Sequence, residues 1–222
     1  MKTAIVCLLH GKVYDPIYVD RLASMVARNT TREYDFYCYT DQPIRNHNTI
    51  TITDPDQFEP VWFKLALLAN EQLASYERKI FLDLDVVIQS SIDWLWDVNP
   101  SRLHVLASLW KPRNGISDHR EKDTLFNSSV MVWRNSSRIF EEFMKASDRH
   151  MMTYKGIDRF LWHENQDVGI LPMDKVYSYR EGATLSDNEP LVYRPSYSIC
   201  IYNQQPKPHT CVQAEPAKSC WK

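Results

Sequence analysis

The most informative stretch of this sequence is Lys-Ile-Phe-Leu-Asp-Leu-Asp-Val-Val-Ile, at residues 79–88. It is an apolar run of strand length that is interrupted by two carboxylates, Asp83 and Asp85. Because side chains alternate between faces along an extended segment, the two carboxylates are expected to point the same way. Charges at the end of a buried strand are costly unless a cation compensates them. Two hard oxygen ligands on one face suit Mn²⁺ or Mg²⁺, usually together with phosphate groups.

The Asp-x-Asp spacing is weak by itself. With 17 Asp among 222 residues, roughly one such pair is expected by chance. Asp54-Pro55-Asp56 has the same spacing, but it lies in turn-like sequence and is interpreted as a solvated loop. The apolar context, rather than the spacing, therefore distinguishes Asp83 and Asp85.

Length and composition favour one globular domain over residues 1–222, large enough to bury a substantial core. The net charge of -2 argues against a nucleic-acid-binding protein, which would normally carry a basic patch. No stretch approaches the ~20 apolar residues that a bilayer-spanning helix needs. The five cysteines contain no Cys-x-x-Cys pair, so a zinc site is not expected. Cys7 and Cys38 fall in predicted buried strands as inert thiols, and the sequence predicts a reducing, cytoplasmic compartment.

Strands and helices alternate in the first part of the chain, which predicts an α/β fold with a mostly parallel central sheet flanked by helices. Asp15-Pro16 is a typical helix start, with Asp as the N-cap and Pro at the first helical position. The predicted strands are residues 3–9, 34–40, 49–53 and 79–88, and the predicted helices are residues 15–29 and 60–73.

Three polar segments follow these predicted strands: His10-Gly11, Thr40-Asp41 and the pair Asp83/Asp85. In open sheets of this kind, ligands bind beyond the carboxyl ends of the strands. The three segments are therefore expected to meet on one rim of the sheet.

The second half of the chain continues with the same kinds of element. Further strands are expected at residues 104–110 and 126–133, with short ones at 168–171, 176–179 and 198–202. Ser136 or Ser137 is expected to cap a helix, and a second helix covers residues 157–163. Residues 111–124 are polar and aperiodic and are interpreted as a loop that could serve as a lid. The tail at residues 204–222 has a composition typical of irregular structure, and it is expected to contribute to the site.

A divalent metal on the rim of an α/β sheet suggests a diphosphate substrate, because the metal neutralises charge that develops on a phosphate leaving group. Basic side chains should approach the same phosphates. Lys64 and Lys207 are the first candidates, and Arg180 is a weaker one.

Several motifs occur in order along nearly the whole chain: Leu8-Leu9-His10, Trp62–Leu65, Phe81–Asp85, Phe126–Trp133 and Pro206–His209. Together they resemble the GT-A glycosyltransferases that use nucleotide-diphosphate sugars, in particular the retaining family 8 and its small bacterial and phage-borne relatives. The resemblance implies a single GT-A (Rossmann-like) domain, a UDP-sugar donor and Mn²⁺ or Mg²⁺. Each motif alone is weak, and the ordered set carries the resemblance.

The resemblance also implies roles for individual residues. The uracil base would be held by Leu8, Leu9 and Tyr14, with Thr40 and Asp41 near it. Lys64 would reach the donor sugar or the diphosphate, and Lys207 would bind the β-phosphate. Asp83 would contact the ribose and the metal, and Asp85 would bind the metal. Asn127 and Ser128 would contact the donor sugar.

The chain departs from the family pattern at two places. The family's third metal ligand comes from a His-containing motif just before the Lys-Pro, and here residues 201–205 contain no histidine. His209 is the predicted substitute, with Asn203 as the alternative. The family's acidic Gly-Asp-Gln stretch appears as Gly156-Ile157-Asp158-Arg159. Asp158 is the candidate acidic residue beside the sugar and, with Asn127, a catalytic candidate; no nucleophile is assigned.

The expected function is transfer of a hexose from a UDP-sugar to an unidentified hydroxyl acceptor, with a metal stabilising the departing UDP. Retention of configuration follows from the resemblance alone. One alternative is a haloacid-dehalogenase-type phosphatase, in which Asp83 would be the nucleophile and Asp85 the acid/base. It lacks support because Val86-Val87 follows the motif and the chain has no Asp-Asp pair. A second alternative is a non-catalytic nucleotide-sugar-binding protein, and the oligomeric state is left open.

Overall fold

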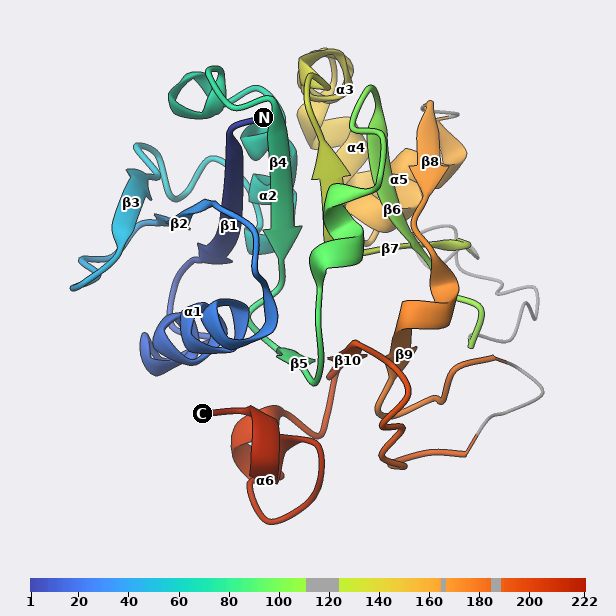
Figure 1. Ribbon diagram of the computed structural model, residues 1–222. Coiled ribbons are helices and arrows are strands. Elements are labelled where there is room, and N and C mark those ends of the chain that lie inside the picture. Colours follow the sequence, from blue (N-terminus) through green and yellow to red (C-terminus); the bar gives the residue numbers. More distant parts are fainter. Residues whose placement is uncertain (111–123, 165–166, 185–188) are drawn as a thin grey trace.

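The computed structural model describes residues 1–110, 124–164, 167–184 and 189–222. The predicted loop at residues 111–124 therefore lies, except for Thr124, outside the described residues. Within the described residues, seven strands form the main sheet in the order β3-β2-β1-β4-β7-β6-β8 (Figure 1). All of these strands run parallel except β7, which is antiparallel to both of its neighbours. The predicted α/β class with a mostly parallel central sheet is confirmed.

The strands of the main sheet are short and mostly buried. Their bounds are β1 (Thr3–Leu9), β2 (Asp35–Thr40), β3 (Asn48–Thr51), β4 (Arg78–Leu82), β6 (Leu103–Ala107), β7 (Phe126–Trp133) and β8 (Val168–Ile170). A second sheet in the order β5-β10-β9 is formed by β5 (Val86–Ile88), β10 (Ile199–Ile201) and β9 (Val176–Ser178). The predicted strands at residues 3–9 and 126–133 match β1 and β7 to the residue.

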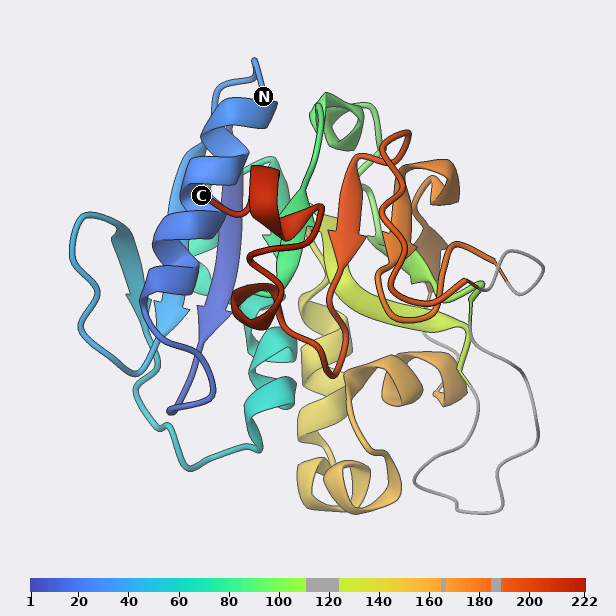
Figure 2. The same ribbon diagram turned by 90° about the horizontal axis from the view of Figure 1, so that it is seen from below.

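Both faces of the main sheet are covered, which explains the continuous apolar runs in its central strands. Ile5, Cys7 and Leu9 of β1 pack into one core cluster with α1 (Ile17–Asn29) and the second sheet. Ala4 and Val6 pack into the other cluster, beneath α2 (Phe63–Leu67), α3 (Ser137–Met144) and α5 (Ile157–His163). Figure 2 shows α1 and the C-terminal tail on one side of the sheet and the helices α2, α3, α4 (Ser147–Thr153) and α5 on the other.

The predicted continuous strand at residues 79–88 is wrong. β4 ends at Leu82 and β5 begins at Val86 in the other sheet, so Asp83 and Asp85 lie in a turn between them. The Asp83 amide still donates to the Ser129 carbonyl of β7 at 2.9 Å, and the chain then turns through a bond from the Val86 amide to the Asp83 carbonyl at 3.3 Å. The alternation of side chains along an extended segment therefore does not explain why the two carboxylates lie together.

Two predicted helices also differ from the structure. The helix expected at residues 60–73 is divided into the 3₁₀ helix η1 (Pro60–Trp62), α2 and the 3₁₀ helix η2 (Glu71–Leu73). The break occurs where the Asn70 side chain accepts a bond from the Gln72 amide and so caps a new turn. Helix α5 matches its predicted range, whereas α4 (Ser147–Thr153) was not predicted. Ser136 is the N-cap residue of α3, as predicted, but its hydroxyl makes no capping bond.

The tail after residue 204 is mostly irregular, in agreement with its composition. It contains only a short 3₁₀ helix, η7 (Pro208–Thr210), and the short helix α6 (Ala217–Cys220) within the described residues. Ala217 and Trp221 are buried in the same cluster as α1. Among the described helices, none has the length and apolar content needed to cross a membrane.

Asp93 joins the end of α1 to the 3₁₀ helix η3 (Asp93–Trp96). Its carboxylate accepts bonds from the Thr30 hydroxyl at 2.6 Å and from the Thr31 hydroxyl at 2.8 Å and amide at 3.2 Å. These bonds, first that from Thr30, lower the pKa of Asp93 below its ordinary value. A carboxylate with a lowered pKa stabilises the folded state above the pKa of the unfolded chain, and this contribution is lost as the pH falls through the lowered value.

We therefore expect Asp93→Ala to lower the free energy of unfolding at pH 7 by about 1 kcal/mol, the typical net value of such bonds. Below about pH 4, the unperturbed pKa of Asp, the difference between the variant and the wild type should shrink. Urea denaturation of both proteins at pH 7 and pH 3 measures this. An equal difference at the two pH values would show that the ionised carboxylate is not the stabilising group.

Candidate functional site at the carboxyl end of the sheet

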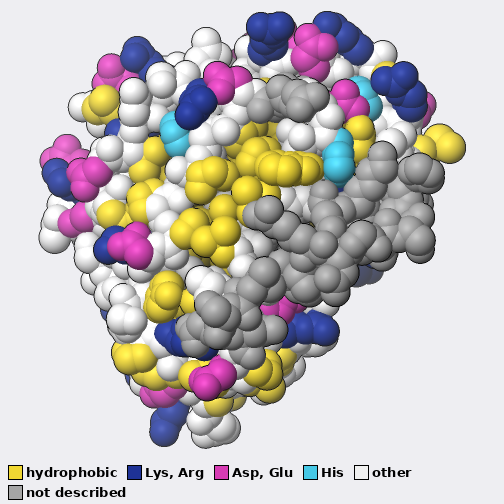
Figure 3. Space-filling model, turned by 90° about the vertical axis from the view of Figure 1, so that its right-hand side faces the viewer, with side chains coloured by type: hydrophobic (Ala, Val, Ile, Leu, Met, Phe, Trp, Pro, Cys, Tyr) yellow, Lys and Arg dark blue, Asp and Glu magenta, His cyan; other side chains and the backbone are white. Residues whose placement is uncertain are grey.

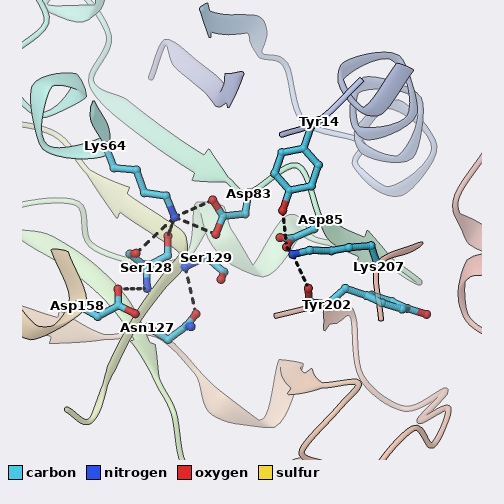
Figure 4. Close-up of polar contacts among 10 residues, drawn as sticks. All are labelled: Tyr14, Lys64, Asp83, Asp85, Asn127, Ser128, Ser129, Asp158, Tyr202 and Lys207. Atoms are coloured by element: carbon cyan, nitrogen blue, oxygen red, sulfur yellow. Dashed lines mark hydrogen bonds and ion pairs between the residues drawn. The ribbon is translucent and has the colours of Figure 1, made fainter. Parts of the chain in front are cut away.

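The turn that carries Asp83 and Asp85 lies at the carboxyl end of β4, beside the strand ends at His10 and Thr40. β7 runs in the opposite direction, so its first residues, including Asn127 and Ser128, reach the same rim. Figure 4 shows the two carboxylates at the centre, with Lys64 approaching from one side and Lys207 from the other. The convergence that the strand ends predicted is therefore present.

Lys64 forms the first ion pair of the site. Its Nζ lies 2.7 Å from Asp83 Oδ1 and 2.9 Å from Oδ2, and it also donates to the carbonyl and hydroxyl oxygens of Ser128 at 3.4 Å. The side chain is buried although it belongs to a helix. Phe63 and Leu65 beside it are also buried, and its Nζ lies 5.0 Å from the centre of the Phe81 ring. Helix α2 therefore directs an ammonium group through apolar surroundings to the rim.

Lys207 forms the second ion pair, and it comes from the other end of the chain. Its Nζ contacts Asp85 Oδ2 and donates to the Tyr202 carbonyl at 3.2 Å. The Tyr14 hydroxyl donates to the same Asp85 oxygen at 2.9 Å. The Tyr202 amide donates to the Asp85 carbonyl at 3.1 Å, which holds the start of the tail against the turn.

The electrostatics of the site are set by two carboxylates and two ammonium groups in a largely desolvated space. Burial raises the pKa of Asp85, and the negative charge of Asp83 raises it further. Lys207 and the Tyr14 hydroxyl oppose both effects. Burial also raises the pKa of Tyr14, and the two carboxylates add to that rise. Lys64 and Lys207 therefore compensate the two carboxylates in this structure, whereas the sequence predicted that both lysines approach phosphate groups.

The predicted sugar-contacting residues lie together beside Lys64. The Ser128 amide donates to Asp158 Oδ1 at 2.9 Å, and this bond connects α5 to β7. The Asn127 side-chain oxygen accepts from the Ser129 amide at 3.1 Å. Asp158 Oδ2 makes no hydrogen bond within the described residues. Asp158 thus lies beside the Asn127-Ser128 segment with one carboxylate oxygen uncommitted, and its place beside a sugar stays a prediction.

The predicted base-binding residues form the opposite part of the rim. Leu9 is fully buried in the core, so only its backbone could meet a ligand, whereas Leu8 is partly exposed. Asp41 accepts from the Gly11 amide through both carboxylate oxygens at 3.2 Å, and the φ of +61° at Gly11 is one that glycine adopts readily. The Thr40 hydroxyl accepts from the Gln42 amide at 3.0 Å. Thr40 and Asp41 therefore shape the loop at this end of the rim.

The predicted third metal ligand is not assembled with the other two. His209 Nδ1 contacts the Tyr18 hydroxyl, whose pKa is raised by burial to about 12. The alternative, Asn203, accepts from the Ser178 hydroxyl at 2.6 Å. Among the residues that the structure describes, no group of three or more His, Cys, Asp or Glu side chains is arranged to hold a metal ion. The third ligand stays a prediction.

Two parts of the site were not predicted from the sequence. Tyr14 was expected to hold a base, and its bond to Asp85 was not foreseen. Tyr202 contributes through its backbone, and backbone contacts leave no residue-type signal in a sequence. Arg180, the weaker basic candidate, lies outside this group and donates to the Gln204 side chain.

No family model and no curated protein sequence matches this chain. Among solved structures, the galactosyltransferase LgtC in complex with donor and acceptor sugar analogs is similar, with 16% identity and a TM-score of 0.67 over 97% of this chain and 92% of that one. The glycosyltransferase GlyE of Streptococcus pneumoniae TIGR4 has 15% identity and a TM-score of 0.59, and the match covers 93% of this chain and 56% of GlyE. The bifunctional glycosyltransferase WbbM has 12% identity and a TM-score of 0.58, and the match covers 93% of this chain and 46% of WbbM. The fold is the GT-A glycosyltransferase fold.

The ion pair between Lys207 and Asp85 makes a testable prediction about stability. In Lys207→Met the largely buried Asp85 carboxylate loses its cation, and we expect the free energy of unfolding to fall by about 3 kcal/mol, the lower end of the range for buried pairs. The double variant Lys207→Met/Asp85→Asn should lose less than the sum of the single changes, because no uncompensated charge remains.

Urea denaturation of the four proteins measures the coupling between the two positions. Lys218→Met, which changes an exposed lysine of the same tail, is the matched control and should be near neutral. Additive effects of the two single changes would contradict a stabilising ion pair.

Proposed function

We propose that this protein is a metal-dependent glycosyltransferase that transfers a hexose from a UDP-sugar to a hydroxyl acceptor. The observation that supports the proposal most directly is the position of Asp83 with Lys64 and Asp85 with Lys207, on the ligand-binding rim of a GT-A fold. The site combines hard oxygen ligands for a divalent cation with ammonium groups for a diphosphate. Retention of configuration is part of the proposal and rests on the resemblance to family 8.

The donor groups present fit the proposed metal. Asp83 and Asp85 would hold Mn²⁺ or Mg²⁺, with His209 as the proposed third ligand and Asn203 as the alternative. Each carboxylate is already compensated by a cation, so the site is built to hold positive charge between these groups. A bound metal would supply Lewis-acid stabilisation of the leaving diphosphate.

The lysines would have a second role once a divalent cation compensates the carboxylates. Lys64 and Lys207 would then be available to donate to phosphate oxygens of the donor. Lys207 would bind the β-phosphate, and Lys64 would reach the diphosphate or the sugar. Such charge-assisted bonds favour the state in which negative charge has moved onto the departing UDP.

The remaining residues would bind the two ends of the donor. Leu8, Leu9, Tyr14, Thr40 and Asp41 would hold the base, with Leu9 acting through its backbone. Asn127 and Ser128 would bind the hexose, and Asp158 Oδ2 is free to accept from a sugar hydroxyl. No carboxylate here is assigned as a nucleophile, because the Asp158 oxygen bonded to Ser128 has a structural role.

The phosphatase alternative is not favoured. A nucleophilic aspartate must attack a phosphorus centre, and here Asp83 and Asp85 are each engaged by a lysine. The similar solved structures are glycosyltransferases. A non-catalytic nucleotide-sugar-binding protein would use the same contacts, and only turnover distinguishes it from an enzyme.

Ligand binding is the first test of this proposal. UDP and Mn²⁺ together should raise the melting temperature more than either alone, because a ligand that binds only the folded state stabilises it. At 100 times Kd the stabilisation would be about 2.7 kcal/mol. Asp85→Asn should lose the metal-dependent part of the shift. Asp54→Asn, from the other Asp-x-Asp sequence, should keep it, and equal shifts in both variants would refute the metal assignment.

Turnover is the second test. Incubation with a panel of nucleotide sugars should release UDP from UDP-hexoses in the presence of Mn²⁺ or Mg²⁺ and a hydroxyl acceptor, and EDTA should stop the release. Because metal assistance is worth several kcal/mol and each 1.36 kcal/mol is tenfold in rate, Asp83→Asn and Asp85→Asn should lower kcat by at least about a hundredfold. Phosphate release from phosphomonoesters would favour the phosphatase, and binding without turnover would favour the non-catalytic protein.

A further inference from the structure

A pocket, called the distal pocket below, lies at the opposite end of the main sheet from Asp83 and Asp85. It has a volume of about 670 Å³. Leu103, the first residue of β6, lines it, as does Ser136, which follows the last residues of β7. β6 runs parallel to β4, so this is the amino-terminal end of both strands. The proposed metal-binding turn follows the carboxyl end of β4, and the two sites are therefore separate.

The floor of this distal pocket is apolar, but two of its buried side chains are polar. Leu103 and Phe160 are fully or almost fully buried, whereas Ser136 and His150 are 8% and 6% exposed. His150 Nδ1 lies 3.0 Å from the Phe143 carbonyl. A carbonyl can only accept, so Nδ1 carries the proton of that bond and Nε2 is the free ring nitrogen.

Neither of these polar groups has a partner. Within the described residues, His150 Nε2 makes no hydrogen bond, and the Ser136 hydroxyl makes none either. Ser136 is the N-cap residue of α3, where a serine hydroxyl ordinarily accepts from a backbone amide of the first turn. Both residues line the pocket, and neither of these two atoms is fully enclosed by protein, so a bound molecule or water can reach and satisfy them.

The charges around the pocket are unevenly compensated. Each acidic side chain in the lining has a partner: Glu142 pairs with Lys145 at 2.7 Å, Asp167 pairs with Arg102 at 2.7 Å, and Glu164 accepts from the Tyr154 hydroxyl at 2.5 Å. Arg138 and Arg149 also line the pocket. Neither forms a salt bridge within the described part of the chain. Figure 3 shows basic and acidic side chains together along the upper edge of this side of the molecule.

These features share one chemistry. The amino end of α3, which has eight residues, points partial positive charge toward Ser136. Arg138 and Arg149 can each present planar pairs of N–H donors, which match the oxygens of a carboxylate or phosphate group. The Ser136 hydroxyl can donate to the same group, and His150 Nε2 can donate when it is protonated or accept from a hydroxyl of the ligand.

We propose that this distal pocket is a binding site for an oxyanion, a carboxylate or phosphate group, carried by a small polar ligand. Arg138 and Arg149 bind the charge, and Ser136 and His150 bind the same ligand from the floor. The pocket is large enough for a sugar that bears such a group, because ligand pockets typically span about 300–1,000 Å³. The site is independent of the proposed transferase activity, since it shares no residue with the Asp83–Lys207 group.

The test compares inorganic phosphate, D-glucuronate and neutral D-glucose in thermal-shift titrations at constant ionic strength, adjusted with NaCl. We expect phosphate, glucuronate or both to stabilise the wild-type protein beyond the NaCl control, and glucose to have no effect. A shift with phosphate alone assigns the site to phosphate groups, and a shift with glucuronate alone assigns it to carboxylates. No shift with either anion overturns the proposal.

Variants locate the binding. Arg138→Gln/Arg149→Gln should weaken the anion affinity at least tenfold, whereas Arg32→Gln/Lys218→Gln, which removes two exposed positive charges elsewhere, should not change it. Ser136→Ala and His150→Asn should each weaken the anion affinity. Ser136→Ala leaves the core intact, so it tests the site even if the His150→Asn variant does not fold. All pocket variants should keep the shift with UDP and Mn²⁺. An anion effect that survives Arg138→Gln/Arg149→Gln and disappears in Lys207→Met would place the anion at the rim and overturn the proposal.

Discussion

This structure depends on the placement of two carboxylates in one turn, with Asp85 buried and Asp83 partly exposed. Removing such groups from water costs several kcal/mol each, and the cost is offset only by close cations and hydrogen bonds. Lys64 and Lys207 supply the cations from positions far apart in the chain, and the Tyr14 hydroxyl adds a bond to Asp85. The turn therefore holds α2, the second sheet and the tail together at one rim.

This constraint connects stability to the proposed chemistry. In the proposed chemistry, a metal and a diphosphate would take over the compensation that Lys64 and Lys207 provide, so that no bare charge is exposed. The Lys207–Asp85 pair that holds the tail would then be one of the contacts that change on binding. The distal pocket differs, because Arg138 and Arg149 form no salt bridge with a described carboxylate, although the charge of Arg138 contributes, after that of Lys145, to the lowered pKa of Glu142.

Elements with a strong local signal were predicted well. The continuous apolar run of β1 and the apolar second half of β7 matched the structure because burial on both faces selects residue types directly, and α5 matched its predicted range. The turn at Asp83 failed for the opposite reason. Residues 79–88 have strand composition on both sides of the carboxylates, and local composition cannot show that β4 and β5 belong to different sheets.

The sequence by itself determined the fold class, the rim on which polar strand ends meet, and the residue types that gather there. These follow from the apolar runs of buried strands and from the alternation of strands with helices along the chain. Only the tertiary structure decided which lysine pairs with which aspartate, that His209 contacts Tyr18, and that Ser136 faces a pocket with an unbonded hydroxyl. These are contacts between residues distant in the chain. Their partners are set by how the sheets and the tail pack, and no local pattern records that packing.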